Sequence, residues 1–291
     1  VLGFMEAPNW GWTSLPIMGL FLLSIISLIT FIGWEKKIPH PLVELTLFKN
    51  LTFTTLFSVL LIIQAVAIVF VFLAIFLQNV LHYSPLMAGL LLLPAMVPIM
   101  LMAPVGGHLR DKYGPTLPMF CGALLVVLSL IWIAIFSHNR GYAWLFPGLL
   151  VYGIGMPLIL SGIMATVMNM VNAQQRGMAS AIFNCARQFG NTIGLALLTG
   201  LLASVNKWQL NSFLHHSPVP LSRLKEQQID GLLVQSDQAM KAIAHLSLAH
   251  IELLKTAALN AYTNAFSMTL LAAAILAFLS LFLILKIPRK Q

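Results

Sequence analysis

Long uninterrupted runs of apolar residues, separated by short polar or charged stretches, fill most of the chain. The runs do not alternate apolar and polar positions, so they are typical of membrane helices rather than membrane strands. About 20 apolar residues in a helix cross the roughly 30 Å hydrocarbon layer, and each run reaches that length. A lipid-exposed segment must pair its own backbone polar groups, so we assign every run to a helix, and each run can be an uninterrupted one. The seven predicted spans cover residues 13–34, 52–77, 85–109, 116–136, 143–168, 181–205 and 261–286.

The composition also indicates a membrane protein. The 291 residues are 59% hydrophobic and only 8% charged, and the mean hydropathy is +0.91. Soluble domains are about 25% charged. We therefore predict an all-α, polytopic transmembrane helical bundle that crosses a membrane several times. The net charge of +8 does not indicate a nucleic-acid partner, because the basic residues are scattered singly at segment ends and form no basic face.

The placement of Lys and Arg predicts the orientation, because cytoplasmic loops are enriched in both. The loops at 35–51, 106–115 and 169–180 and the C-terminus carry most of the basic residues outside the long loop, so we expect them in the cytoplasm. The short loops opposite carry only Arg140. The long loop at 206–260 is expected outside; it is basic as well, but loops of this length translocate largely regardless of charge.

No constellation of catalytic residues is found in the sequence. Asp and Glu occur in loops and at segment ends, with no HExxH-type metal helix and no phosphate-binding loop. Cys121 and Cys185 lie far apart inside apolar segments, without the spacing of a metal or redox pair, and are predicted to be buried packing residues. The sequence therefore predicts neither an enzyme, nor a cofactor, nor a metal site.

A cluster of charge separates the third and fourth spans at Gly106–Pro115. We expect a tight cytoplasmic turn with Asp111 just ahead of the next helix, where exposed amides and basic neighbours hold its carboxylate. Such a contact would favour one arrangement of the helices and loosen when they move. The alternative is an ordinary inner loop that obeys the positive-inside bias. The candidate gating residues are Gly107, Asp111, Lys112 and Gly114.

Polar residues at membrane depth are few, and each is a candidate functional residue. Arg187 stands out, because a guanidinium inside a membrane helix costs about 2.5 to 3.5 kcal/mol on insertion scales. Either it extends to the cytoplasmic headgroups, or it pairs with a carboxylate or carbonyls on another helix and helps to hold one conformation. Asn184 and Asn191 accompany it in the sixth span. Gln64, Gln78 and Asn79 of the second span are candidates for the wall of a substrate cavity.

The charged turn and its surroundings resemble a known family. Gly107, Asp111, Lys112 and Gly114 fit G-x-x-x-D-[RK]-x-G, the loop signature of the major facilitator superfamily. The stretches 78–115 and 176–194 resemble the corresponding segments of EmrB/QacA-type fourteen-span drug:proton antiporters. The first span and residues 34–50 are similar to the last of the two extra central helices of that group. Pro115, Thr116 and Leu117 replace the basic residues that usually close the motif, so the copy is partial.

This resemblance implies a division of the chain and a function. Residues 1–50 would be an extra central helix with a cytoplasmic linker, and residues 51–291 would be the C-terminal six-helix bundle with its long outer loop at 206–260. The implied function is proton-coupled efflux of amphipathic small molecules, and the implied location is a bacterial inner membrane. The implied partners are a missing N-terminal bundle, which would carry the main proton-coupling acid, the lipid bilayer, and a periplasmic adaptor if the cell has a double membrane. The alternatives are an exporter of a specific metabolite or siderophore, and a truncated membrane protein that does not transport.

Overall fold

The computed structural model describes residues 2–3, 10–11, 13–35, 37, 45–216 and 248–287. Within these residues the chain is all-helical, and seven helical segments are long and apolar enough to cross a membrane, which confirms the predicted fold class. The helices are α2 (Leu15–Glu35), α3 (Leu51–Ala67), α4 (Val69–Asn79), α5 (Pro85–Leu91), α6 (Leu93–Tyr113), α7 (Thr116–Phe136), α8 (Tyr142–Met170), α9 (Arg176–His216) and α12 (Leu248–Leu285).

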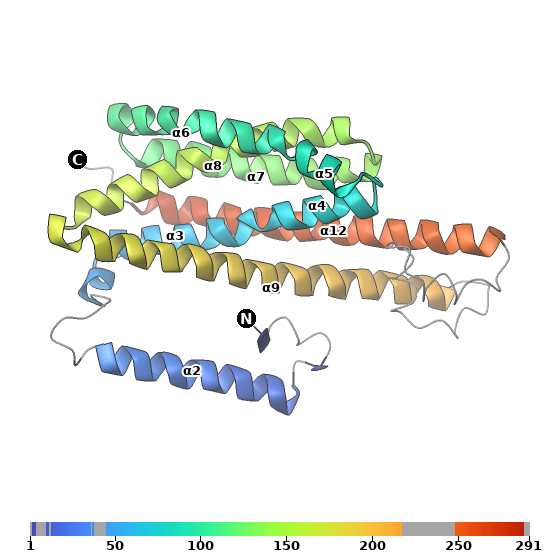
Figure 1. Cartoon of the computed structure of the whole chain (residues 1–291), viewed down its shortest axis with the longest axis horizontal. Helices are drawn as coiled ribbons and strands as arrows, with labels where there is room; N and C mark the ends of the chain where they lie inside the picture. Colours follow the sequence, from blue (N-terminus) through green and yellow to red (C-terminus); the bar gives the residue numbers. More distant parts are fainter. Residues whose placement is uncertain are drawn as a thin grey trace.

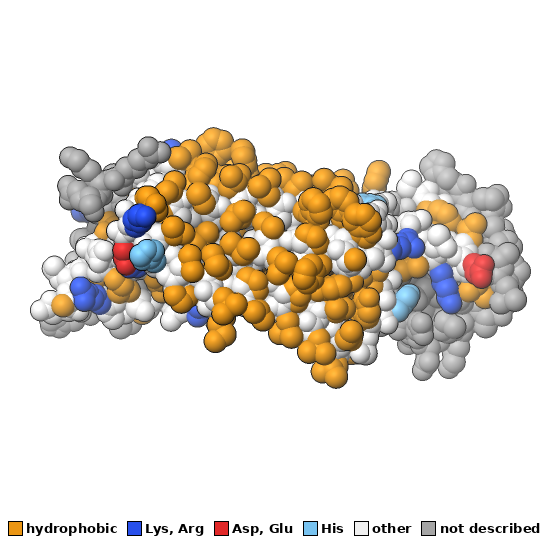
Figure 2. Space-filling model, turned by 90° about the horizontal axis from the view of Figure 1, so that it is seen from above, with side chains coloured by type: hydrophobic (Ala, Val, Ile, Leu, Met, Phe, Trp, Pro, Cys, Tyr) orange, Lys and Arg blue, Asp and Glu red, His pale blue; other side chains and the backbone are white. Residues whose placement is uncertain are grey.

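Six of the seven crossings form one bundle, and α2 lies apart from it (Figure 1). Helices α3, α4 and α12 run through the middle of the bundle. On one side, α12 packs against α7, α7 against α8, and α8 against α6; on the other side, α9 packs against both α3 and α12. Figure 2 shows a broad belt of hydrophobic side chains with the charged residues collected at its two ends. This distribution suits a bundle that crosses a bilayer, because only its ends meet water.

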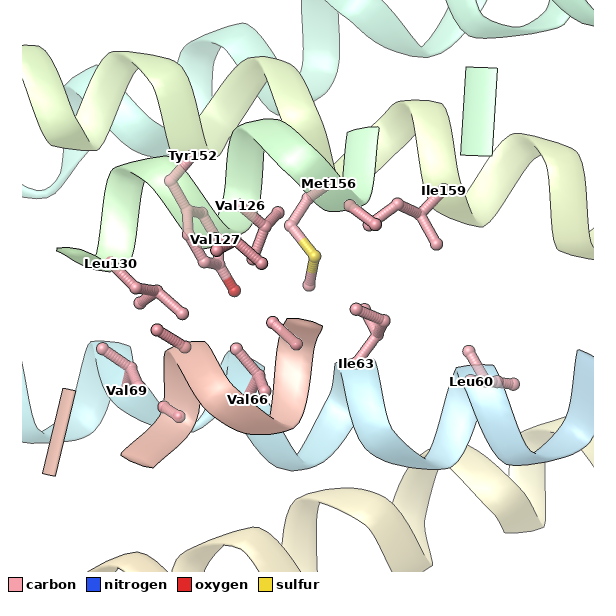
Figure 3. Packing of buried hydrophobic residues seen from close by; sticks show 14 of the residues in the cluster. Leu60, Ile63, Val66, Val69, Val126, Val127, Leu130, Tyr152, Met156 and Ile159 are labelled. Atoms are coloured by element: carbon pink, nitrogen blue, oxygen red, sulfur yellow. The ribbon is translucent and has the colours of Figure 1, made fainter. Parts of the chain in front are cut away.

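The core lies where α3 and α4 face α7 and α8. Figure 3 shows four side chains of α3 and α4 pointing toward those of α7 and α8. Those of α3 and α4 are Leu60, Ile63, Val66 and Val69, and those opposite are Val126, Val127, Leu130, Tyr152, Met156 and Ile159. Most are β-branched or otherwise compact, so the helices pack by shape. Close packing is the main attraction available here, because lipid tails are as apolar as the core itself.

Glycines bring α8 into close contact with its two neighbours. A Cβ at Gly153 would meet the Ala95 carbonyl of α6, and one at Gly155 would lie 2.7 Å from the Gly122 carbonyl of α7. A third glycine of α8, Gly162, faces Met119 of α7 in the same way. Small residues at these three positions thus permit the close approach of α8 to α6 and α7.

Two of the predicted spans are membrane-length helical segments that are each divided in two at a single residue. The third span breaks between α5 and α6 at Leu92, two residues before Pro94, which cannot donate a helix hydrogen bond. The second span breaks at Ile68, whose backbone is tightened toward a 3₁₀ turn (φ −64°, ψ −13°). The Val71 amide donates to the Ile68 carbonyl, so the turn keeps its hydrogen bonding without a proline or glycine.

The outer ends of the last two helices reach further than predicted. Helix α9 continues to His216 and α12 begins at Leu248, so both extend into the loop expected at 206–260, whose centre lies outside the described residues. Hydropathy marks where a helix leaves the membrane, not where it ends, and the first helix breaker after α9 is Pro218. Cys121 and Cys185 were also misplaced, because both are exposed on the bundle surface, where lipid accepts small apolar side chains as readily as a core does.

Candidate functional site

The charged turn joins α6 to α7. Helix α6 continues through the expected loop as far as Tyr113, so only Gly114 and Pro115 link the two helices. Gly114 has φ +80°, a conformation that side chains rarely adopt, and its amide donates to the Arg110 carbonyl 2.8 Å away. This glycine therefore closes the helix and turns the chain. Gly107, in contrast, lies inside α6 with no neighbouring atom within 4 Å of an added Cβ.

Asp111 lies in the last turn of α6 rather than at the start of α7. Its carboxylate accepts hydrogen bonds from Arg110 at 2.6 and 2.9 Å, and its side chain is 66% exposed. The expectation that amides of the next helix hold it was therefore wrong. The carboxylate instead lies near the negative end of the α6 dipole, where it is not stabilised. Lys112 next to it lies over the Tyr113 ring, 5.1 Å from the centroid.

Replacing Asp111 with asparagine is expected to leave the stability of the fold almost unchanged. An exposed pair such as Arg110–Asp111 contributes about 0.2 to 1 kcal/mol, and removal of a negative charge from a helix C-terminus offsets part of that loss. Thermal unfolding of the purified protein in detergent checks this, with Arg110→Gln as the matched variant. A fall in transport rate at unchanged stability would indicate a conformational role, whereas a large loss of stability would contradict the exposed position of the pair.

A polar stripe follows the inner half of α9. Asn184, Gln188 and Asn191 lie four and three residues apart, so they share one face of the helix, and Arg187 lies at its edge. Asn191 is half-buried, and the other three are exposed. The same face continues outward as Leu195, Leu198 and Leu202, so the polar part is confined to the inner half. We use "α9 polar stripe" for Asn184, Arg187, Gln188 and Asn191.

Gln64 lies beside this stripe, inside the bundle. Helix α9 crosses α3 at Gly190 and Gly194, where added Cβ atoms would meet the backbone of Leu61 and Ala65. The Cβ of Gln64 is the next neighbour of Gly190, and the residue is only 7% exposed. Gln64 therefore lies at the α3–α9 interface and not on an open wall.

Gln78 and Asn79 lie at the opposite end of the same crossing, as the last two residues of α4. Both are half-buried, and the Gln78 amide donates to the Ala74 carbonyl one turn back at 3.1 Å. They are about 14 residues from Gln64, or roughly 20 Å along a helix. The structure therefore brings Gln64 near the α9 polar stripe but leaves Gln78 and Asn79 at the outer mouth.

A hydrogen-bonded network ties three helices together at the outer end, and sequence reasoning missed it. His138, in the turn after α7, bonds to the Asn264 side chain of α12 at 2.8 Å. The Asn264 amide donates to Gln209 of α9 at 3.0 Å, and Arg140 donates to Asn260. Asn264 lies in the predicted span 261–286, but its partners are more than 50 positions away along the chain, so no local pattern indicated these contacts.

These polar groups are suited to binding and movement rather than to bond chemistry. Among the described residues, no group of three or more His, Cys, Asp or Glu side chains could hold a metal ion. The described acids are Glu35, Asp111 and Glu252, and all lie at or near helix ends. Where the structure describes the chain, it thus places one guanidinium and several amides at membrane depth, with no carboxylate beside them.

Comparisons with known proteins agree on one family. Residues 2–195 match the family described as Major Facilitator Superfamily. The chain is 31% identical over 225 residues to "Multidrug resistance protein Stp" of Mycobacterium tuberculosis, which covers 77% of this chain and 42% of that protein. It is 28% identical over 206 residues to the "Tetracenomycin C resistance and export protein" of Streptomyces glaucescens, which covers 70% of this chain and 38% of that protein. The chain thus spans less than half of the length of each relative.

A solved structure shares the fold. The crystal structure of a bacterial homologue of the human lysosomal transporter Spinster, in an inward-facing and occupied conformation, aligns with a TM-score of 0.56 at 16% identity. The alignment covers 82% of this chain and 49% of that one. At this identity the likeness concerns the fold alone.

Proposed function

Because the chain belongs to the major facilitator superfamily, we propose that it is the C-terminal portion of a membrane exporter that expels amphipathic drugs in exchange for protons. The observation that carries the proposal is the family match over residues 2–195, combined with relatives named for multidrug resistance and drug export. The family makes a transporter the basic function, and the relatives' names favour drug efflux.

The proposal of a C-terminal portion is supported by lengths and by charge. The chain spans 42% of one relative and 38% of another, as a piece of a longer transporter would. No described acid lies at membrane depth, which agrees with a proton-coupling acid located in another bundle. Helix α2 lies apart from the six-helix bundle, as an extra central helix of an EmrB/QacA-type transporter would (Figure 1).

Basic residues support the proposed orientation. The end of α6, the start of α9 and the end of α12 carry Arg110, Lys112, Arg176 and Lys286. Enrichment in Lys and Arg is typical of a cytoplasmic face. We therefore place the turns at 106–115 and 169–180 and the C-terminus in the cytoplasm, and the segment between α9 and α12 outside.

The test compares the full-length gene product with this chain alone in a bacterium that lacks its own drug exporters. We expect the full-length protein to raise the inhibitory concentrations of several amphipathic drugs and to lower the accumulation of these drugs in the cells. A protonophore should abolish this efflux, because it collapses the proton gradient. The chain alone should give no efflux. Efflux that persists with the protonophore would contradict proton exchange, and a full-length protein without any efflux would contradict the proposal.

A second candidate is an exporter dedicated to one metabolite or siderophore. It is favoured by the relative named for export of tetracenomycin C, a single compound. The same drug panel separates the two functions, because a dedicated exporter protects against one chemical class only. A third possibility is a truncated protein that does not transport. It is supported only by the fraction of the relative that this chain covers, and a full-length product with efflux activity would contradict it.

A further inference from the structure

The α9 polar stripe lies on a face of the helix that the bundle does not cover. Helix α9 meets α3 through Gly190 and Gly194, and it also packs against α12. The stripe residues Asn184, Arg187 and Gln188 remain exposed. One guanidinium and three amides on one face would be costly against lipid, because lipid offers these groups no hydrogen-bond partners. The stripe therefore faces a polar space and not the hydrocarbon.

Arg187 also lies inside the membrane part of its helix. It is six residues past the start of the predicted span at 181–205, which corresponds to roughly 9 Å at 1.5 Å per residue. That distance is about a third of the roughly 30 Å hydrocarbon layer. Arg187 is therefore a fixed positive charge beside a polar space, and the low-dielectric helices around that space focus its field.

No carboxylate of the described residues can neutralise this charge. The described acids are Glu35 at the end of α2, Asp111 at the end of α6 and Glu252 near the outer start of α12. The local field along the stripe is therefore positive, which repels a permanent cation and attracts an anion. The three amides add hydrogen-bond donors around the guanidinium, whose planar fork matches a carboxylate with two parallel bonds.

On these grounds we propose that the α9 polar stripe binds a carboxylate or comparable oxyanion of the transported molecule, with Arg187 as the group that selects it. The substrate class is then an anionic or zwitterionic amphiphile. This inference rests on the proposed export function and adds the chemical class of the substrate to it.

The test measures uptake into everted membrane vesicles that contain the full-length protein. The probes are a fluoroquinolone, its ethyl ester, which has the same rings without the carboxylate, and ethidium, a permanent cation. Arg187→Gln should raise the KM for the fluoroquinolone about ten-fold or more, since charge-assisted hydrogen bonds are lost, and should leave uptake of the ester unchanged. Arg187→Lys should recover part of the affinity, because it keeps the charge without the planar fork. Arg176→Gln at the cytoplasmic end of the same helix is the control and should leave the uptake of all three probes unchanged.

Each other outcome overturns the inference in a distinct way. Equal losses of uptake for all three probes in Arg187→Gln would mean that Arg187 has a structural role or pairs with a carboxylate in another bundle. The amount and the thermal stability of the variant protein would separate these two explanations. No change for any probe would mean that the guanidinium only extends to the headgroups. Uptake of ethidium alone by the wild type would refute the oxyanion site but leave the export function standing. A wild type that takes up no probe would remove both.

Discussion

Replacing Gly155 with alanine is expected to weaken the packing of α8 on α7, even though alanine is the better helix former. The added Cβ would lie 2.7 Å from the Gly122 carbonyl and 3.1 Å from atoms of Leu125 and Val126, and the closest of these is backbone that cannot rotate away. Overpacking of this kind costs about 1 to 3 kcal/mol. The gain in helix propensity offsets up to about 1 kcal/mol of it. We expect a lower thermal midpoint of the purified protein in detergent.

Gly200→Ala is the matched control for this substitution. Gly200 also lies inside a long helix, α9, but nothing lies within 4 Å of an added Cβ there. Only the propensity gain then remains, so Gly200→Ala should leave the midpoint unchanged or raise it. The two changes are identical in chemistry and opposite in expected sign. Equal shifts in the same direction would contradict the close α7–α8 contact.

Replacing Phe76 with alanine is expected to open a cavity between α4 and α12. The Phe76 ring is fully buried and stacks on Phe266, with 4.4 Å between centroids and 17° between planes. The stability cost of such a truncation in a soluble protein has two terms, the lost transfer of the side chain from water and the cavity that it leaves. In a membrane the separated helices stay in lipid, so the transfer term is small and the cavity term remains. A cavity of roughly 100 Å³, at about 24 cal/mol per Å³, gives a loss of about 2 kcal/mol. Unfolding in detergent at increasing temperature measures it.

Phe278→Ala provides the comparison for Phe76→Ala. Phe278 lies on the same helix as Phe266, α12, but it is 47% exposed and contacts Phe282 edge to face. Its truncation removes lipid-facing surface and leaves no cavity, so we expect a loss of stability well below that of Phe76→Ala. Phe76→Leu, which refills most of the space, should recover part of the stability. If Phe278→Ala lowers the stability as much as Phe76→Ala does, the stacking between α4 and α12 does not contribute specifically to stability.

The membrane spans were predictable because the bilayer imposes one rule on every crossing. About 20 apolar residues are needed whatever the neighbours are, so hydropathy alone finds seven spans. The same rule fails beyond the hydrocarbon, where α9 and α12 continue as polar helices through Asn206 and Asn260. It also cannot separate lipid from core, which is why Cys121 and Cys185 were placed wrongly.

The candidate site was predictable in residue type but not in surroundings. A guanidinium at membrane depth is unusual in any fold, so Arg187 could be selected from the sequence. Its isolation from every described acid, and the burial of Gln64 against α9, depend on which helices meet. The outer network of His138, Asn264 and Gln209 joins residues more than 50 positions apart along the chain, so no local pattern could indicate it.

The sequence by itself determined that this chain is a polytopic helical membrane protein, because its apolar runs and sparse charges leave no other structure that satisfies backbone hydrogen bonds in lipid. Only the tertiary structure decided that Asp111 ends one helix instead of starting the next, and that the α9 polar stripe is left open. The reason is physical: hydropathy and spacing act within one segment, whereas exposure and charge pairing depend on which helices pack together.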